Sequence, residues 1–145
     1  MEIVRFLGEY QYSVDDKGRL IIPSKYRQPL LEGLVITRGL DKNLAIYPLN
    51  GWDRLSEKIE GLPYADTRAR LFRRLVFSGA VDLVPDKQGR INIPTYLLAY
   101  AQIDKEVVVA GANSFIELWS PVRWQAEREA MESDDTADQW ANLGI

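Results

Sequence analysis

The sequence predicts a mainly β protein of the α+β class, built from two tandem β-β-α-β-β repeats. The pattern Asp-x-x-Gly-Arg-x-x-Ile-Pro begins at Asp15 and again at Asp86, a separation of 71 residues. Short apolar stretches bounded by turn residues surround both copies, as is typical of strands. A proline ends each copy of the pattern, at a position where it suits the first turn of a helix. With 145 residues, 46% of them hydrophobic, the chain can form one domain with a buried core.

The duplication extends beyond this pattern. Phe6 corresponds to Phe77 at the same separation, and after the second proline the separation becomes 72 and pairs Trp52 with Trp124. Solenoid and propeller repeats are 20 to 50 residues long, so this period favours two half-domains related by a pseudo-twofold axis. One repeat alone would leave a large apolar face uncovered, and we therefore expect the two repeats to cover each other.

Each repeat is expected to contain four strands and one helix. In the first, the strands are expected at 9–14, 20–22, 34–37 and 44–47 and the helix at 24–31. In the second, the strands are expected at 80–84, 91–93, 106–110 and 115–119 and the helix at 95–101. We call residues 15–19 the first turn and residues 86–90 the second turn; in each, a glycine suits a left-handed conformation.

Further helices are expected after each repeat. Between the repeats, residues 67–77 form a linking helix, with Asp66 or Thr67 as its N-cap. Its apolar face contains Ala69, Leu71, Phe72, Leu75 and Val76, with Arg68 in the same arc and Arg70, Arg73 and Arg74 opposite. We expect these four arginines to be solvated or to form an oligomer interface, where Arg68 would pair with a carboxylate.

A second helix begins after Ser120, the expected N-cap, with Pro121 at its first position. The expected organisation is one domain over 1–145, with repeats at 9–51 and 80–123, a helical linker at 52–79 and an acidic C-terminal segment at 124–145. Trp52 and Trp124 are interpreted as packing anchors of the two halves.

The composition narrows the classes of function. The chain has no cysteine and no histidine, which removes thiol nucleophiles, Ser-His dyads and nearly all zinc sites. We expect that the protein is not an enzyme and binds no cofactor. No basic-then-apolar leader and no apolar run of membrane-spanning length is present, so we expect a cytoplasmic protein without membrane or small-molecule partners.

Taken alone, the net charge of −3 argues against a nucleic-acid partner. Residues 1–85 contain 13 Lys/Arg and 11 Asp/Glu, however, whereas residues 86–145 contain 5 and 10. An acidic C-terminal segment can therefore hide a basic face elsewhere.

The two turns contain the residues that could carry chemistry. A guanidinium held by a fixed turn matches guanine edges and phosphates bidentately, and neighbouring lysines and amides add donors. The DNA-binding candidates are Lys17, Arg19, Lys87, Gln88 and Arg90. Asp15, Gly18, Asp86 and Gly89 are expected to shape the turns.

The aspartates of the turns allow two other interpretations. Each aspartate could pair with the arginine four residues on, and the pair would then serve structure alone. Repetition does not decide between these readings, because both copies would inherit such a pair from one ancestor. A general acid and base role for Asp15, Asp16 and Asp86 is unsupported, because no nucleophile, phosphate loop or metal spacing accompanies them.

The runs Asp-Asp-Lys-Gly-Arg-Leu-Ile-Ile-Pro-Ser-Lys-Tyr-Arg at 15–27 and Asp-Lys-Gln-Gly-Arg-Ile-Asn-Ile-Pro at 86–94 resemble the MraZ family of bacterial proteins. That family belongs to the AbrB/SpoVT/MazE group of swapped-hairpin β-barrels. The resemblance covers about residues 5–125. It implies a pseudo-twofold barrel within one polypeptide, where many relatives outside the family carry one copy and dimerise.

The resemblance also implies a function. It implies a nucleoid-associated transcriptional regulator of the division and cell-wall gene cluster, forming a homo-oligomeric ring that binds short direct repeats of double-stranded DNA in its own promoter. Lys17, Arg19 and Arg90 would then touch DNA. Gln88 stands where Lys17 stands in the first repeat, and Leu98 where Arg27 stands, so we expect the first turn to be the principal reader. The alternative is a protein-interaction module related to the antitoxins of this fold, which docks through its acidic tail.

Overall fold

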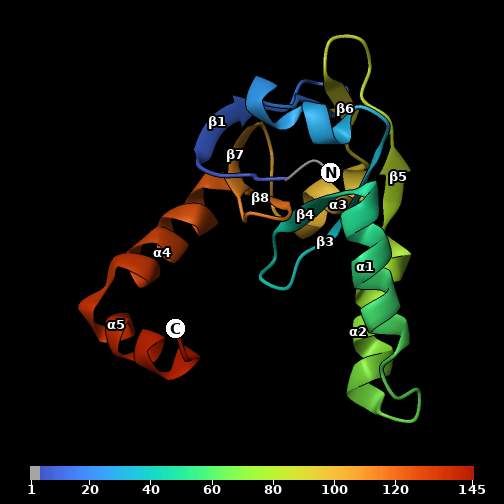
Figure 1. Ribbon diagram of the computed structural model, residues 1–145. Coiled ribbons are helices and arrows are strands. Elements are labelled where there is room, and N and C mark those ends of the chain that lie inside the picture. The colour runs from blue at the N-terminus through green and yellow to red at the C-terminus, as the bar shows by residue number, and fades with distance from the viewer. Residues whose placement is uncertain (1–3) are drawn as a thin grey trace.

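The structure is a computed structural model that describes residues 4–145 (Figure 1). It confirms the α+β class, with antiparallel strands and short helices. The first repeat contains β1 (Glu9–Ser13), β2 (Arg19–Ile21), β3 (Leu34–Arg38) and β4 (Leu44–Pro48), followed by helices α1 (Leu49–Glu60) and α2 (Thr67–Gly79). The second contains β5 (Val81–Leu83), β6 (Arg90–Asn92), α3 (Thr95–Tyr100), β7 (Glu106–Gly111) and β8 (Ile116–Trp119), followed by α4 (Pro121–Glu132), α5 (Asp134–Trp140) and a 3-10 turn at Ala141–Leu143.

The two repeats are interleaved. Six strands form one antiparallel sheet in the order β1-β7-β8-β4-β3-β5, so that β1 pairs with the second repeat and β5 with the first. The remaining strands, β2 and β6, pair with each other in a separate two-stranded ribbon. Because each repeat supplies strands to the other, the two halves share one core.

The prediction of a closed barrel is wrong. Strands β1 and β5 end the six-stranded sheet, and within residues 4–145 they do not pair with each other. The strands that could have joined those edges, β2 and β6, are used in the ribbon, which is tied to β1 through an isolated bridge between Val14 and Leu20. The sheet is therefore open.

The prediction of a helix at 24–31 is also wrong. Two 3-10 turns take its place, Ser24–Tyr26 and Gln28–Leu30. Pro29 explains the difference, because proline lacks an N–H and its ring clashes with the carbonyl four residues earlier. The second repeat has Tyr100 at the matching position, and α3 is a regular α-helix there.

Both predicted helix caps are confirmed. The Asp66 carboxylate accepts from the Arg68 amide at 2.8 Å, and the Ser120 hydroxyl accepts from the Arg123 amide at 3.2 Å. Pro121 is the first residue of α4, as expected. Each cap occupies a donor that the first turn of a helix leaves without an intrahelical partner.

The core lies between the ribbon and one face of the sheet. Leu20 of β2 and Ile91 of β6 point into it and are almost fully buried, as are Phe6 and Ile46. Two helical projections extend from this body, α1 with α2 on one side and α4 with α5 on the other (Figure 1). No helix within residues 4–145 is both long and apolar enough to cross a membrane.

Candidate nucleic-acid interface

The first turn is organised around one carboxylate. Asp15 Oδ1 accepts from the backbone amides of Lys17 at 3.0 Å and Arg19 at 2.9 Å, and Oδ2 accepts from Arg19 Nε at 2.7 Å. The amide of Arg19, and then its guanidinium, lower the pKa of Asp15 below its usual value. The aspartate is therefore ionised at neutral pH and holds both the backbone and the arginine side chain of the turn.

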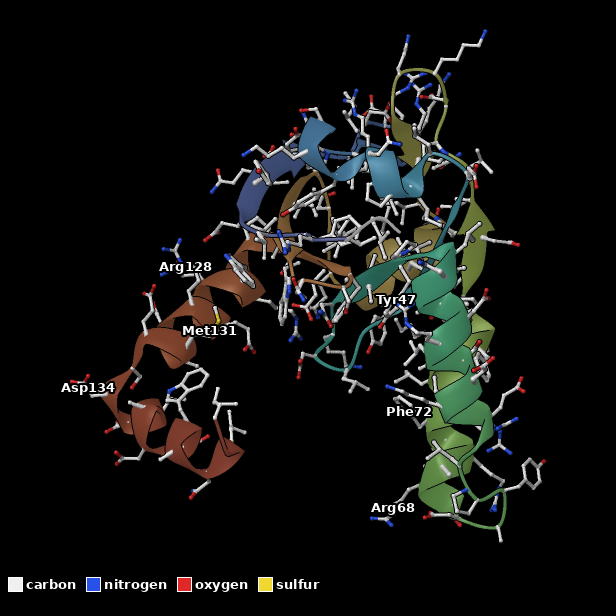
Figure 2. All side chains as sticks on the ribbon, viewed as in Figure 1. Tyr47, Arg68, Phe72, Arg128, Met131 and Asp134 are labelled. Carbon is white, nitrogen blue, oxygen red and sulfur yellow. The ribbon has the colours of Figure 1, made fainter. Side chains whose placement is uncertain are left out.

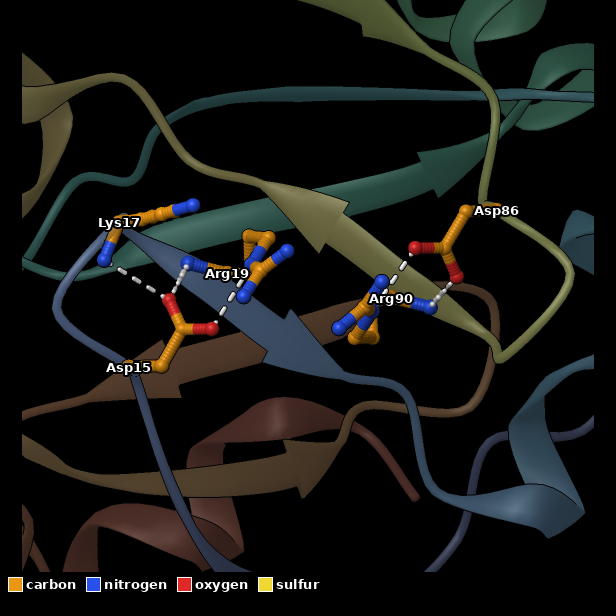
Figure 3. Close-up of polar contacts among 5 residues, drawn as sticks. All are labelled: Asp15, Lys17, Arg19, Asp86 and Arg90. Atoms are coloured by element: carbon orange, nitrogen blue, oxygen red, sulfur yellow. Dashed lines mark hydrogen bonds and ion pairs between the residues drawn. The ribbon is translucent and has the colours of Figure 1, made fainter.

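The second turn repeats this geometry. Asp86 Oδ1 accepts from the amides of Gln88 and Arg90, both at 2.9 Å, and Oδ2 accepts from Arg90 Nε at 2.8 Å. The Arg90 amide and guanidinium lower the pKa of Asp86 in the same way. Figure 3 shows the two carboxylate-arginine pairs side by side on the ribbon.

The glycines of the two turns are pinned across the pseudo-twofold axis. Gly18 and Gly89 have φ values of +80° and +77°, in the left-handed region where a side chain is strained. The Gly18 carbonyl accepts from the Ile93 amide at 2.8 Å, and the Gly89 carbonyl accepts from the Ile22 amide at 2.8 Å. Each turn is thus fixed by the strand end of the other repeat.

The ribbon exposes one face to solvent. Its middle residues, Leu20 and Ile91, point inward, so that the flanking positions point outward. In the register, Arg19 lies opposite Asn92 and Arg90 lies opposite Ile21. Both arginines therefore lie on the same outer face.

The geometry of each arginine is compatible with both interpretations that the sequence left open. Only Nε is used in the pair with aspartate, and within residues 4–145 no protein oxygen accepts a hydrogen bond from the terminal nitrogens Nη1 and Nη2 of Arg19 or Arg90. The side chains are 33% and 29% exposed. The aspartate fixes the guanidinium while its outer edge can donate to an external acceptor.

The remaining DNA-binding candidates flank the ribbon. Lys17, Lys87 and Gln88 are exposed on the two turns, and the backbone amides of Lys17 and Gln88 also help to bind the aspartates. Among residues 4–145, no hydrogen bond or ion pair holds their side chains as the aspartates hold those of Arg19 and Arg90.

The sequence placed Arg27 with the first turn, but the structure places it beside the second turn. Its Nε donates to the Ile22 carbonyl at 2.9 Å, and its guanidinium lies against Gly89 of the second turn. Leu98 correspondingly lies against Gly18 of the first turn. The interleaving carries each residue across the axis, so Arg27 adds its charge to the second turn and is no argument for a dominant first turn.

Asn92 and Ile21 are the members of the outer face that sequence reasoning missed. The signal was present, because a strand residue points outward when its neighbour is buried. These two residues occupy equivalent positions of the two repeats and differ in chemistry, an amide against a hydrocarbon. The outer face is therefore asymmetric.

The four arginines of α2 divide into two pairs. Arg70 donates to the carbonyls of Tyr64 and Ala65 in the loop between α1 and α2, and Arg73 donates to the Ile59 carbonyl in the last turn of α1. Arg68 and Arg74 are exposed, and the Arg68 side chain is 91% exposed beside the Asp66 cap. Leu71, a member of the expected apolar face, is 59% exposed, so the buried part of that face is narrower than its apolar residues indicate.

Comparison with known proteins places the chain in a family. The family model described as "MraZ protein, putative antitoxin-like" matches twice, at residues 5–75 and 76–143. Proteins named "Transcriptional regulator MraZ" are similar over nearly their whole length. That of Herpetosiphon aurantiacus is 51% identical over 97% of this chain and 99% of its own. That of Moorella thermoacetica is 48% identical over 95% and 93%. The chain, with its two Asp-x-x-Gly-Arg turns on one ribbon, belongs to the MraZ family.

Proposed function

We propose that this chain is a sequence-specific DNA-binding transcriptional regulator of the bacterial division and cell-wall gene cluster. In this proposal it forms a ring and binds short direct repeats in its own promoter. The relatives' names support regulation of transcription. The observation that carries the DNA contact is the ribbon, with Arg19 and Arg90 on one face and their terminal nitrogens unused.

The ribbon has the shape and chemistry of a groove reader. The major groove of B-DNA admits a two-stranded β-ribbon, and an arginine there donates bidentately to the O6 and N7 of guanine. Because Asp15 and Asp86 fix the guanidinium groups beforehand, little side-chain freedom is lost on binding. Lys17, Lys87 and Arg27 add cations that can contact phosphates on either side.

The asymmetry of the outer face favours direct repeats. Arg19 lies beside an amide that can pair with adenine, whereas Arg90 lies beside an isoleucine that can contact a thymine methyl group. One chain thus reads a subsite with a direction along the DNA. Copies that follow one another in the same orientation meet subsites in the same orientation.

An assembly is needed because one subunit is a weak DNA ligand. The chain has a net charge of −3 and exposes only a small basic surface on each ribbon. Each neutralised phosphate supplies a share of the affinity that salt reduces. Several ribbons held side by side bind through a raised effective concentration, and repeats about one helical turn apart would present the same face of the duplex to them.

The test measures binding of the purified protein to its own upstream region by fluorescence anisotropy at moderate salt. We expect Arg19→Ala and Arg90→Ala each to weaken binding by about five- to 150-fold, the equivalent of about 1–3 kcal/mol for one bidentate base contact. Arg19→Lys keeps the charge but loses the fork, so it should lose most of the specificity while retaining nonspecific binding. Arg54→Ala, a change on the exposed surface of α1, is the matched control. Equal affinity for the promoter and for a scrambled duplex would overturn the proposal.

A further inference from the structure

A pocket of about 200 Å³, which we call the sheet pocket, lies on the face of the six-stranded sheet that points away from the core. On β4, Ile46 is a core residue, so its neighbours Ala45 and Tyr47 point to the opposite face, where both line the pocket. Leu55 of α1 and Phe72 of α2 line its side wall. Figure 2 shows Tyr47 and Phe72 beside the α1–α2 projection, toward the open space between the two projections. The pocket is therefore separate from the ribbon.

Three aromatic rings line this pocket. The rings of Tyr47 and Phe115 stack, with their centroids 5.1 Å apart and their planes 22° apart, and Phe72 adds a third ring from α2. The volume of the pocket is smaller than that of sites for drug-sized ligands. Its size and its walls therefore suit a small molecule with an apolar body.

One carboxylate stands among these apolar walls. Glu117 of β8 is half-buried and lies between Ala45 of β4 and Ala110 of β7 in the sheet. Its Oε1 accepts from Trp119 Nε1 at 3.0 Å, whereas within residues 4–145 its Oε2 accepts no hydrogen bond and no lysine or arginine pairs with it. A charge that is partly removed from water is costly unless it is paired. Glu117 thus offers an unused acceptor to a cation.

The other charged residues that line the pocket do not neutralise Glu117. Arg38, at the end of β3, has its charge engaged elsewhere, because its Nη1 donates to the Leu75 carbonyl at 3.0 Å and its guanidinium lies 5.9 Å from the ring centroid of Tyr96 on α3. Asp41, in the turn between β3 and β4, adds a second negative charge. The pocket therefore presents negative charge next to aromatic faces.

We propose that the sheet pocket binds a small organic ammonium ion, a protonated primary amine on an apolar body. The ammonium donates to Glu117 Oε2 and lies against the faces of Tyr47 and Phe115, which attract a cation. The apolar body packs against Leu55 and Phe72. Burial, and then the negative charge of Glu117, raise the pKa of the Tyr47 hydroxyl, so the carboxylate and this ring lie close enough to contact one ligand.

The test compares three probes of similar size and different charge. Phenethylamine is a cation at neutral pH, phenethyl alcohol is neutral and phenylacetate is an anion. Isothermal titration calorimetry of the full chain measures their Kd values. We expect phenethylamine to bind at one site per chain and phenethyl alcohol to bind about ten- to 150-fold more weakly, the equivalent of one hydrogen bond to a charged group. Phenylacetate should not bind.

Three variants locate the site. Glu117→Gln keeps the size of the side chain and an acceptor for Trp119 but removes the charge, so it should weaken phenethylamine by about tenfold or more and leave phenethyl alcohol unchanged. Phe72→Ala removes part of the apolar wall and should weaken both probes. Glu32→Gln, an exposed position outside this pocket, is the matched control and should change neither Kd. Circular dichroism verifies that each variant folds.

Three results would contradict the inference. If phenethylamine does not bind the wild type, the pocket is not an amine site. If the amine and the alcohol bind equally well, the carboxylate does not select the ligand. If folded Glu117→Gln binds phenethylamine as the wild type does, the amine binds elsewhere. None of these results bears on the ribbon, because the pocket contains no residue of the proposed DNA contact.

Discussion

The glycine of the second turn offers a quantitative test of how the two repeats are joined. Replacing Gly89 by alanine puts a Cβ at φ +77°, and a left-handed residue with a Cβ costs about 1–2 kcal/mol. That Cβ would also lie 2.6 Å from Arg27 Nε, so the guanidinium must move and lose its bond to the Ile22 carbonyl. A bond of this kind contributes about 0.5–1.5 kcal/mol. The expected loss of unfolding free energy is therefore about 1.5–3.5 kcal/mol.

Thermal unfolding followed by circular dichroism measures this loss. For a chain of this length, about 1.5–3.5 kcal/mol lowers the Tm by roughly 3–14 °C. Gly61→Ala is the control, because φ is −75° there and the nearest atoms to a new Cβ are 3.5 Å away, so its Tm should not fall. In an Arg27→Ala background the cost of Gly89→Ala should shrink to the conformational part alone, about 1–2 kcal/mol. A Tm equal to that of the wild type would refute this account of the turn.

Two further predictions concern the ribbon. Hydrogen bonds lower the folded-state pKa of Asp86, so its carboxylate adds stability that is fully present above the ordinary pKa of 3.8 and is lost as pH falls through the lowered value. Asp86→Asn should remove that contribution. The unfolding free energy of this variant should therefore fall less steeply with decreasing pH than that of the wild type. If the unfolding free energy of Asp86→Asn falls with decreasing pH as steeply as that of the wild type, the carboxylate is not bound as described. Asn92→Ile gives both arginines an isoleucine as their cross-strand neighbour, so DNA selected by this variant from a random pool should have two more similar half-sites, and an unaltered consensus would remove Asn92 from the reading face.

Much of the fold was predictable because duplication repeats the same local signals. The Asp-x-x-Gly-Arg turns, the short strands around them and the Ser120 cap each depend on residues close in sequence, and each lies where the pattern predicts it. The one helix that was wrongly predicted, at 24–31, also depends on a residue close in sequence. Pro29 alone predicts a break in that helix, because proline cannot continue the intrahelical hydrogen bonds.

The site was only partly predictable, because its decisive contacts join residues far apart in sequence. The pairing of β2 with β6 brings Arg19 and Arg90 onto one face, and nothing near either arginine indicates that register. The same pairing moves Arg27 beside Gly89, whereas sequence proximity had assigned it to the first turn. The alternatives for the aspartate-arginine pairs proved compatible, because Nε and the terminal nitrogens of one guanidinium can serve different partners.

The interleaving has a consequence for recognition. The Gly18 carbonyl binds the Ile93 amide and the Gly89 carbonyl binds the Ile22 amide, so neither turn can hold its shape without the strand end of the other repeat. In a dimer of identical chains, equivalent positions would have to carry the same residue, and the outer face would be symmetric. Here both turns belong to one polypeptide, and the position opposite each arginine can differ, as Asn92 and Ile21 do. A fused pair of repeats keeps the mutual support of a dimer, and under the proposed function its asymmetric outer face would read DNA with a direction, which a regulator needs if it follows direct repeats.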